Sequence, residues 1–282
     1  MLVPNVRAIL VSGASSGIGA ATVAAAARAG MFVYAGVRNL ADAERIAALD
    51  ENVRVVQLDV TDAASIEAAV HVVRARGAGL TGLVNNAGVA YGGPLEAIPL
   101  EDLRRQFEVN CFGAIALTQA ALPLLRAQPS RIVFVGSISG RVALPYVAPY
   151  SASKFALRAL ADALRVELKP SAIDVCLIEP GSVATPIWGK GRANAQTQLA
   201  ALPPDAPAYY RAAIENLVLA TQAEERDGLP PERVAAAIVQ ALTRRKPKAH
   251  EIIGTPARLG ALIAMLPASL HDRFLRATMR LP

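Results

Sequence analysis

Short apolar runs rich in Val and Ile alternate along the chain with stretches in which apolar residues recur at helical spacing. The runs are continuous and are bounded by Gly, Asp, Asn or Pro, which is typical of strands buried on both faces of a parallel sheet. Strands are predicted at Val6–Val11, Met31–Ala35, Val53–Leu58, Leu80–Val84, Ile132–Val135, Ile173–Ile178 and, with the weakest pattern, Glu251–Ile253. Helices are predicted at Ile18–Ala29, Ala41–Leu49, Ala63–Ala75, Leu103–Leu125, Tyr150–Leu168 and Pro231–Thr243.

This alternation predicts an α/β fold, a Rossmann-type doubly wound parallel sheet with helices on both faces. Residues 1–254 would form this single domain, and two segments depart from the pattern. Residues 187–229 are a long connection that contains several prolines and the aromatic pair Tyr209-Tyr210, and a connection of this length is usually a lid or a binding element. Residues 255–282 are apolar, basic and helical in spacing, and we expect them to form a C-terminal extension.

The composition agrees with one large domain. The 282 residues are 53% hydrophobic and 18% charged, which suits a packed core and excludes a disordered chain. Cys111 and Cys176 are too few for a disulfide framework, and we expect buried thiols in a reducing, cytoplasmic protein. Apolar stretches such as Leu259–Pro267 are shorter than the ~20 residues of a bilayer helix, and the N-terminus lacks the features of a signal peptide. We therefore expect neither a membrane-spanning segment nor a signal peptide.

A glycine-rich segment follows the first predicted strand and opens the first helix. It reads Ser12-Gly13-Ala14-Ser15-Ser16-Gly17-Ile18-Gly19. Glycines allow a tight turn and the close approach of a pyrophosphate to the backbone, and the helix N-terminus offers N–H groups to that anion. The spacing G-x-x-x-G-x-G differs from the standard dinucleotide motif, and an ordinary strand-to-helix turn is the alternative. The place of the segment between strand and helix favours nucleotide binding.

A cationic residue, Arg38, follows the second predicted strand. An NAD site usually has a carboxylate here for the ribose 2′-hydroxyl, but no carboxylate follows before Asp42. The Arg38 guanidinium carries several donors that suit a 2′-phosphate, although it could also be a solvated surface residue. The missing acid and Arg38 together favour NADP(H) over NAD(H).

Tyr150 and Lys154 are four residues apart in a predicted helix and therefore share one of its faces. A tyrosine with its usual pKa of about 10 is a poor acid or base near neutrality, and an ammonium group within ~5 Å lowers that pKa. Ser137 ends a predicted strand thirteen residues earlier, at the edge of the sheet where ligands of parallel sheets bind. Its hydroxyl could donate to a carbonyl oxygen that Tyr150 protonates, and Ser139 in the same loop is a rival for this role.

Together these motifs resemble those of the short-chain dehydrogenase/reductase family, in its compact single-domain branch. The matching pieces follow the family's order and spacing over residues 5 to about 254, and the thirteen-residue spacing to Tyr150 matches for Ser137 and not for Ser139. The resemblance implies a seven-stranded Rossmann sheet and an oxidoreductase. The pieces are SGASSGIG at 12–19, Asp59-Val60, NNAG at 85–88, Asn110, Ser137, YSASK at 150–154, and Pro180-Gly181 with Thr185.

The resemblance also implies a role for each matched residue. Tyr150 would be the general acid–base, Lys154 would lower its pKa and bind the nicotinamide ribose, and Ser137 would polarise the substrate oxygen. Asn110 would hold a water that extends the proton relay from Lys154. Hydride would pass between the nicotinamide C4 and a carbonyl or carbinol carbon, and no metal site is implied. The cofactor would contact Gly13, Ser15, Ser16, Gly17, Ile18, Gly19, Arg38, Asp59, Val60, Asn86, Ala87, Gly88, Tyr150, Lys154, Pro180, Gly181, Val183 and Thr185.

The substrate is less closely defined. VYAGVRN at 33–39 and KFALRALADALRVEL at 154–168 resemble the branch of the family that acts on steroids, retinoids and similar lipophilic alcohols. Apolar and aromatic residues of the 187–229 segment would close over an apolar ligand, although they could instead pack on the sheet or on a partner subunit. We expect a lipophilic carbonyl or alcohol as the substrate, with a small ketone or a 3-oxoacyl chain as the alternative.

The C-terminal extension combines an apolar side with positive charge. A basic amphipathic helix can lie on an anionic membrane, but Pro267 interrupts this one, and we favour docking on the enzyme or across a dimer. The family habit implies a homodimer or homotetramer built on the Leu103–Leu125 and Tyr150–Leu168 helices. The apolar residues are Leu259, Leu262, Ile263, Leu266, Leu270, Phe274 and Leu275, and the cations are Arg258, Arg273, Arg276 and Arg280.

Other classes of protein fit these features less well. A cofactor-binding protein without turnover would share the fold, but all four catalytic positions are present. Nucleic-acid binding is suggested only by the net charge of +6, and the basic run Arg244–Lys248 resembles a solvated helix end. Sugar-nucleotide epimerases share the Tyr–Lys pair but differ in the spacing of the glycine loop. An NADP(H)-dependent oxidoreductase is therefore the leading interpretation.

Overall fold

The protein is described by a computed structural model that covers residues 7–77, 79–189, 191, 193, 197, 202, 205 and 207–279. Val6, Arg280 and most of residues 190–206 lie outside these described residues. Seven strands form one sheet in the order β3-β2-β1-β4-β5-β6-β7, with all neighbours parallel, which confirms the predicted fold class. The strands are β1 (Ala8–Val11), β2 (Phe32–Val37), β3 (Val53–Gln57), β4 (Gly82–Asn85), β5 (Ser130–Val135), β6 (Ile173–Pro180) and β7 (His250–Ile253).

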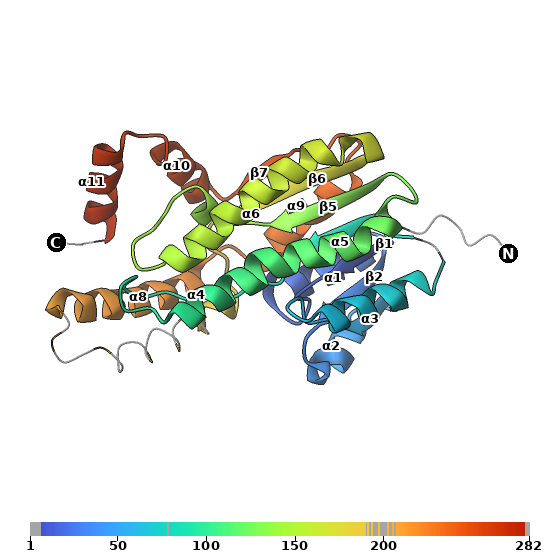
Figure 1. Cartoon of the computed structure of the whole chain (residues 1–282), viewed down its shortest axis with the longest axis horizontal. Coiled ribbons are helices and arrows are strands. Elements are labelled where there is room, and N and C mark those ends of the chain that lie inside the picture. Colours follow the sequence, from blue (N-terminus) through green and yellow to red (C-terminus); the bar gives the residue numbers. More distant parts are fainter. Residues whose placement is uncertain are drawn as a thin grey trace.

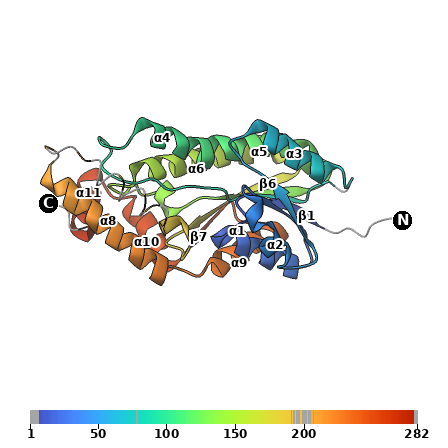
Figure 2. The ribbon, with the colours of Figure 1, turned by 90° about the horizontal axis from the view of Figure 1, so that it is seen from below.

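Helices cover both faces of the sheet (Figures 1 and 2). One face carries α3 (Ala63–Arg74), α4 (Leu100–Phe107), α5 (Gly113–Leu125) and α6 (Ala148–Glu167), and the other carries α1 (Gly17–Arg28), α2 (Ala43–Ala47) and α9 (Pro231–Thr243). Neighbouring strand residues enter different cores: Leu83 packs under α3, α5 and α6, and Val84 packs under α1 and α9. Both faces of each central strand are therefore buried, which explains the uninterrupted apolar runs in the sequence.

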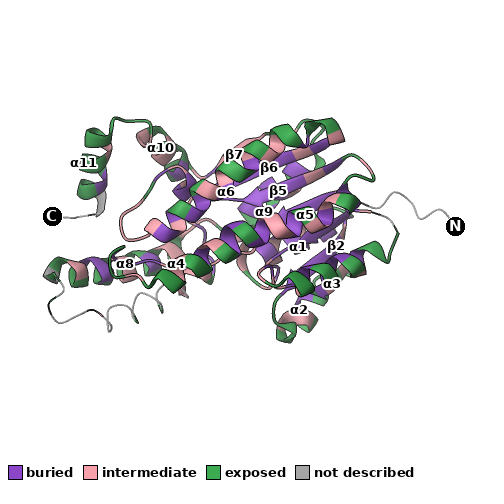
Figure 3. Cartoon of the chain, viewed as in Figure 1, coloured by how far each residue is buried: buried purple, intermediate pink, exposed green. Residues whose placement is uncertain are grey.

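Figure 3 shows that the buried residues are concentrated in the sheet and on the inner sides of the helices around it. Local signals begin several of these helices. The Asp62 carboxylate accepts a hydrogen bond from the Ala64 N–H at 2.9 Å and caps α3, and Pro231 occupies the first position of α9, as its sequence predicts.

Two predicted helices have different limits in the structure. The predicted helix Leu103–Leu125 begins at Leu100 and is interrupted between α4 and α5 by the π turn η2 (Glu108–Phe112). The predicted helix Ala41–Leu49 is a 3-10 turn, η1 (Leu40–Asp42), followed by the short α2. Helical spacing of apolar residues does not distinguish an α turn from a π or 3-10 turn, which is why the sequence pattern missed both.

The two segments that depart from the sheet-and-helix pattern are partly helical. The 187–229 connection contains α8 (Ala208–Asp227), and the C-terminal extension forms α10 (Thr255–Ile263) and α11 (Ala268–Met279). Pro267 lies in the break between α10 and α11, as expected of a residue without an N–H donor. Figure 1 shows α8, α10 and α11 at the end of the molecule where the strands terminate.

Within the described residues, one helical run, Leu100–Leu125, is long and apolar enough to cross a bilayer. More than half of its most apolar window, 56%, is buried inside the fold, where α5 packs against α3, β4 and β5. Burial of this kind is what a core helix of an α/β domain displays.

Candidate active site

The loops at the carboxyl ends of the strands surround a cavity of about 240 Å³. Parallel strands place their carboxyl ends at one edge of a sheet, so residues far apart in the sequence meet there. The predicted catalytic residues Ser137, Tyr150 and Lys154 line this cavity, and Asn110 does not. Of the residues predicted to bind the cofactor, all except Gly19 line it.

The glycine loop after β1 has a backbone that requires glycine at its turns. Gly13 and Gly17 have positive φ angles of 63° and 53°, a region that other residues rarely adopt. A Cβ atom at Gly19 would lie 2.1 Å from the Gly13 carbonyl oxygen, so Gly19 allows α1 to begin directly against the loop. Ser16 is the N-cap of α1, but its side chain makes no hydrogen bond to the N–H groups of the first helical turn. Ser16 therefore does not cap these N–H groups, which belong to a turn that lines the edge of the cavity.

Ser12 and Asn86 hold the glycine loop in place. The Asn86 Nδ2 donates to the carbonyl oxygens of Ser12 and Gly13, at 3.1 and 3.0 Å. The Ser12 hydroxyl oxygen accepts from the N–H groups of Asn86 and Ala87, at 3.0 and 3.1 Å. The NNAG segment therefore supports the loop as well as lining the cavity, a role that the sequence motif did not predict.

The far end of the cavity carries a cation and a carboxylate. Arg38 lines the cavity beside Asp59, whose Oδ1 accepts from the Thr61 N–H at 2.9 Å and from the Thr61 hydroxyl at 2.7 Å. Burial raises the pKa of Asp59, but the Thr61 hydrogen bonds and the positive charge of Arg38 outweigh it, so the pKa lies below its usual value. Asp59 is therefore ionised at neutral pH, and it caps the turn after β3.

A second arginine near this end was not predicted from the sequence. Arg45 donates from Nη2 to the Ser15 carbonyl oxygen at 2.6 Å and to Asp42 Oδ1 at 2.6 Å. Asp42, the first carboxylate after β2, is thereby engaged in an ion pair with Arg45.

Ser137, Tyr150 and Lys154 converge from β5 and α6. The hydroxyl groups of Ser137 and Tyr150 are hydrogen-bonded, and the Lys154 Nζ lies 5.7 Å from the centre of the Tyr150 ring. Lys154 is 6% exposed and donates to the Val135 carbonyl oxygen at 2.9 Å. Two proton-bearing hydroxyl groups and one buried amine thus meet within one wall of the cavity.

The pKa values in this group differ in one respect from the prediction. Burial lowers the pKa of Lys154 to about 8. Burial also raises the pKa of Tyr150, and the hydrogen bond from Ser137 only partly opposes that rise. The predicted lowering of the Tyr150 pKa by Lys154 is therefore not seen in this geometry, since desolvation of the phenol dominates and the ammonium group is bonded to Val135 instead.

Asn110 lies in the π turn η2 rather than in a regular helix. Its Oδ1 accepts from the Val89 N–H at 2.9 Å, and its Nδ2 donates to the Val89 carbonyl at 3.0 Å and to the Ser153 hydroxyl at 3.0 Å. The side chain thus ties the loop after β4 to α6, next to Lys154. Both hydrogens of Nδ2 are engaged in these bonds, so Nδ2 has no donor left for a water. The family resemblance implies that Asn110 holds a water, and this role stays a prediction that would involve the Asn110 backbone or the second lone pair of Oδ1.

Ser137 and its rival Ser139 have different surroundings. Ser137 lines the cavity and is the N-cap of the 3-10 turn η3 (Ile138–Gly140), where its oxygen accepts from the Ser139 N–H at 3.1 Å. Ser139 is not part of the cavity wall. The cavity thus favours Ser137, in agreement with the motif spacing.

Aromatic side chains from the 187–229 connection lie at one end of the site. Ile187 and Trp188 line the cavity, and the Trp188 indole donates to the Val183 carbonyl oxygen at 2.6 Å. Tyr210 of α8 makes an edge-to-face contact with Tyr146, with 6.5 Å between ring centres. Tyr146 has a positive φ angle of 64°, a strained conformation for an aromatic residue. The start of the connection therefore contributes to the cavity wall, and closure of residues 187–229 over a substrate stays a prediction.

Some cavity residues were missed because they are apolar and belong to no motif. Their only signal in the sequence is their place at the end of a predicted strand or within a predicted helix. Those residues are Leu58, Val89, Val109, Val135, Gly136 and Pro186. Among the residues that the structure describes, no group of three or more His, Cys, Asp or Glu side chains could hold a metal ion.

The family is shown by comparison with known proteins. Residues 7–196 match the family model described as short chain dehydrogenase. The chain is 36% identical over 278 residues to an NADPH-dependent 3-dehydrocapnine reductase of Ornithobacterium rhinotracheale, with 95% of each chain covered. It is 31% identical over 274 residues to a 3-ketodihydrosphingosine reductase of Bacteroides thetaiotaomicron, covering 97% of this chain and 96% of the relative. The chain therefore belongs to the short-chain dehydrogenase family of oxidoreductases.

Solved structures agree with this assignment. A short chain dehydrogenase of Burkholderia cenocepacia in complex with NADP has a TM-score of 0.73 and 27% identity, with 98% of both chains covered. A short chain dehydrogenase/reductase of Burkholderia phymatum in complex with NAD has a TM-score of 0.77 over 100% of this chain and 98% of that chain, and at 22% identity it supports the fold alone. A nicotinamide cofactor is thus the shared ligand class, and the choice between NADP and NAD is a separate question.

Proposed function

We propose that the protein is an NADP(H)-dependent oxidoreductase that interconverts a carbonyl group and an alcohol on a lipophilic substrate. The observation that carries the proposal is the meeting of Ser137, Tyr150 and Lys154 in one cavity whose opposite end is the glycine loop. The positive-φ glycines, the α1 N-terminus and Arg38 fit the phosphates of a dinucleotide.

The residues of the chain would act on the proton. The Tyr150 phenol would donate a proton to the carbonyl oxygen during reduction and accept it from the alcohol during oxidation. The Ser137 hydroxyl, which lies close enough to Tyr150 to lower its pKa by hydrogen bonding, would hold that oxygen in place, and Lys154 would bind the nicotinamide ribose. When bound, the nicotinamide would supply or accept the hydride. Apolar walls around the group would keep water away from the exchange.

Support for NADP(H) comes from the residue that follows the carboxyl end of β2. Arg38 is exposed to solvent and lines the cavity, where its guanidinium could bind a 2′-phosphate. The nearest carboxylate in the sequence, Asp42, is engaged with Arg45. The relative from Ornithobacterium, named as NADPH-dependent, supports the same choice.

Support for a lipophilic substrate comes from the aromatic end of the site. Ile187 and Trp188 line the cavity with large, mostly apolar surfaces, and the edge-to-face pair of Tyr146 and Tyr210 adds aromatic surface from α8 and the loop before α6. The relative named for reduction of 3-ketodihydrosphingosine agrees with a keto substrate. A small ketone, a 3-oxoacyl chain, or cofactor binding without turnover are the alternatives.

A panel of carbonyl compounds tests this proposal. NADPH and NADH oxidation would be followed with bulky apolar ketones and aldehydes and with small polar ones. The proposal predicts turnover with NADPH on the bulky apolar compounds. Turnover restricted to small polar ketones would contradict the lipophilic substrate, and tight NADPH binding without turnover of any carbonyl would contradict the enzyme.

We also propose that the C-terminal extension contacts an anionic membrane. Ala257 and Leu275 of the extension are buried, but much of its apolar side is exposed. Leu262 and Met265 are 64% and 81% exposed, with Leu259, Leu266 and Leu270 also exposed and with Arg258 and Arg273 nearby in the sequence. Apolar surface beside cations suits an anionic lipid surface.

Sedimentation with vesicles tests the membrane contact. The chain should sediment with phosphatidylserine-containing vesicles more than with neutral phosphatidylcholine vesicles, and Leu262→Ser with Met265→Ser should abolish the difference. Leu219→Ser, on α8 and 62% exposed, is the matched control. Equal binding by both variants, or a change in oligomeric state without vesicle binding, would contradict the proposal.

A further inference from the structure

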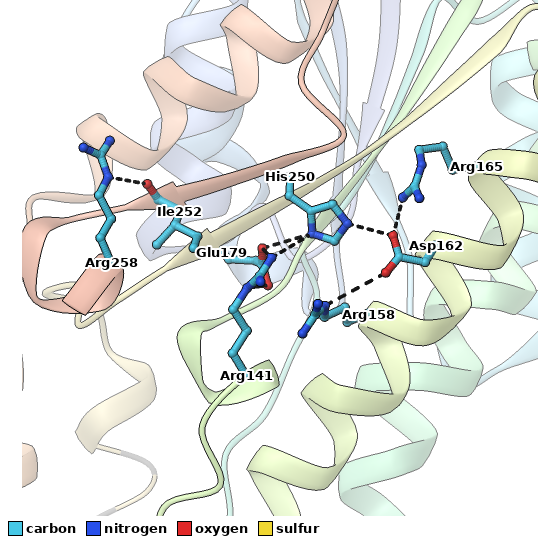
Figure 4. Close-up of polar contacts among 8 residues, drawn as sticks. All are labelled: Arg141, Arg158, Asp162, Arg165, Glu179, His250, Ile252 and Arg258. Atoms are coloured by element: carbon cyan, nitrogen blue, oxygen red, sulfur yellow. Dashed lines mark hydrogen bonds and ion pairs between the residues drawn. The ribbon is translucent and has the colours of Figure 1, made fainter. Parts of the chain in front are cut away.

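Four charged side chains form a network next to the catalytic group but outside the cavity (Figure 4). Arg141 donates two parallel hydrogen bonds to Glu179, from Nε to Oε1 at 2.8 Å and from Nη2 to Oε2 at 2.7 Å. His250 bridges two carboxylates, with Nδ1 3.1 Å from Glu179 Oε2 and Nε2 2.7 Å from Asp162 Oδ1. The four residues come from the end of η3, from β6, from β7 and from α6.

Glu179 is the centre of this network. Its side chain has no exposed surface, and no water can stabilise its charge there. Burial raises the pKa of Glu179, but the hydrogen bonds from His250 and Arg141 outweigh it and hold the pKa below its usual value. A buried carboxylate of this kind depends on its cationic partners, because the loss of one partner leaves a charge without compensation.

Three of the four members, Arg141, Glu179 and Asp162, belong to segments that also carry a cavity residue. Arg141 directly follows the η3 turn, whose N-cap is Ser137. Glu179 directly precedes Pro180 and Gly181, which line the cavity and are among the residues predicted to contact the cofactor. Asp162 lies two turns after Lys154 on α6.

The η3 turn, which Ser137 caps and which we call the Ser137 turn, is held at two points. At Gly140 the turn is packed so tightly on α6 that a Cβ atom would lie 2.8 Å from the Lys154 carbonyl oxygen. One residue later, the two hydrogen bonds of Arg141 fix the turn to β6. The position of the Ser137 hydroxyl relative to Tyr150 thus depends on the place where Glu179 holds Arg141.

We propose that Arg141, Glu179, His250 and Asp162 are positioning residues that hold the Ser137 turn against α6 and β6 in the geometry required for proton transfer at Tyr150. This inference rests on the proposed function and deepens it. None of the four side chains lines the cavity, so they act through Ser137 and not on the substrate.

The protonation state of His250 makes this arrangement sensitive to pH. As an imidazolium, His250 donates to both Glu179 and Asp162, and as a neutral ring it loses one of these donors. The groups that face it are Glu179 from β6, Asp162 from α6 and Arg141 from η3, with Arg158 and Arg165 paired to Asp162. The negative charges of Glu179 and Asp162 outweigh the positive charge of Arg141, so the protonated form of the His250 ring is favoured.

Conservative variants test the proposal. Arg141→Lys keeps the charge but removes the two-pronged contact, and it should lower kcat about tenfold while the KM for NADPH changes less than about twofold. Arg131→Lys is the matched control, because Arg131 is also a partly buried arginine paired with a carboxylate, Asp174, at the opposite end of the same strands. The wild type should show a decline in kcat as His250 deprotonates above about pH 6.5, and His250→Gln should lack this decline.

If the four residues only stabilise the fold, Arg141→Lys and Arg131→Lys should lower the melting temperature alike and leave kcat and its pH profile unchanged. This result would overturn the proposal. Hydrogen exchange of the amides of residues 137–142 gives a readout without turnover, and Arg141→Lys should accelerate it where Arg131→Lys does not. If the wild type has no Tyr150-dependent turnover, the proposed function fails. The positioning role of the network then fails as well if Arg141→Lys leaves the hydrogen exchange of residues 137–142 unchanged.

Discussion

Lys154 illustrates how burial sets the chemistry of single residues in this site. Removal from water lowers the pKa of Lys154 to about 8, so the amine is still mostly charged at neutral pH but loses its proton well below its usual range. Tyr150, raised in pKa by the same burial, is a protonated donor that suits the reductive direction. Near neutrality Tyr150 therefore holds its proton, which is the state that can donate to a carbonyl oxygen.

Arg38 is the residue on which the choice of cofactor depends. Arg38→Ala should weaken NADPH binding about tenfold, because a charge-assisted contact to a 2′-phosphate would be lost, and it should leave NADH binding nearly unchanged. Dissociation constants from fluorescence titration with both cofactors measure the difference. An equal loss for both cofactors would refute the phosphate assignment.

Among the elements, the strand β7 connects the sheet to the catalytic helix through His250. The hydrogen bond that His250 donates to Glu179 raises the pKa of His250 above its usual 6.5 against the opposing effect of burial, and Asp162 raises that pKa further. The pKa values of Glu179 and Asp162 lie below their usual 4.5 and 3.8 in spite of burial, through their hydrogen bonds to His250 and to Arg141 or Arg165. The network thus has all its charges over a limited range of pH.

This network predicts a pH dependence of stability. The raised pKa of His250 contributes stability that is fully present below pH 6.5 and is lost as the pH rises through the pKa of the folded state. The lowered pKa values of the carboxyl groups contribute stability that is lost as the pH falls below 4.5. The melting temperature should therefore decline above pH 6.5, and less steeply in His250→Gln. His71→Gln, an exposed histidine on α3, is the control. A decline of equal slope in wild type and His250→Gln would contradict the assignment.

The same elements show what the sequence can and cannot predict. The parallel sheet was predictable because uninterrupted apolar strands leave few arrangements, and most cavity residues were predictable because they belong to motifs that resemble those of the family. The network was not, because Arg141 and His250 are 109 residues apart and meet only through the packing of β6, β7 and α6. The π turn that holds Asn110 has the same apolar spacing as an α-helix, and the side-chain contacts of Asn110 depend on a loop after β4.

For the whole molecule, the helix α6 and the turn η2 between α4 and α5 present large apolar residues to solvent. Phe112 and Val166 are 58% and 70% exposed, and Phe155 and Leu160 are also exposed. We predict a homodimer or homotetramer through this face, because burial of these side chains is favourable. Val166→Glu should shift sedimentation towards a smaller species, and Leu219→Glu on α8 should not. A monomeric wild type, or equal dissociation in both variants, would contradict this assembly.

The account as a whole depends on proton transfer by Tyr150, which is tested by removing its hydroxyl alone. Tyr150→Phe should lower kcat for carbonyl reduction by about 100-fold or more and leave the NADPH dissociation constant within about threefold. Tyr34→Phe is the matched control, because the Tyr34 hydroxyl is buried in the core with no hydrogen-bond partner among the described residues. Loss of turnover in Tyr150→Phe alone is the predicted result. Retention of turnover in Tyr150→Phe would contradict the mechanism.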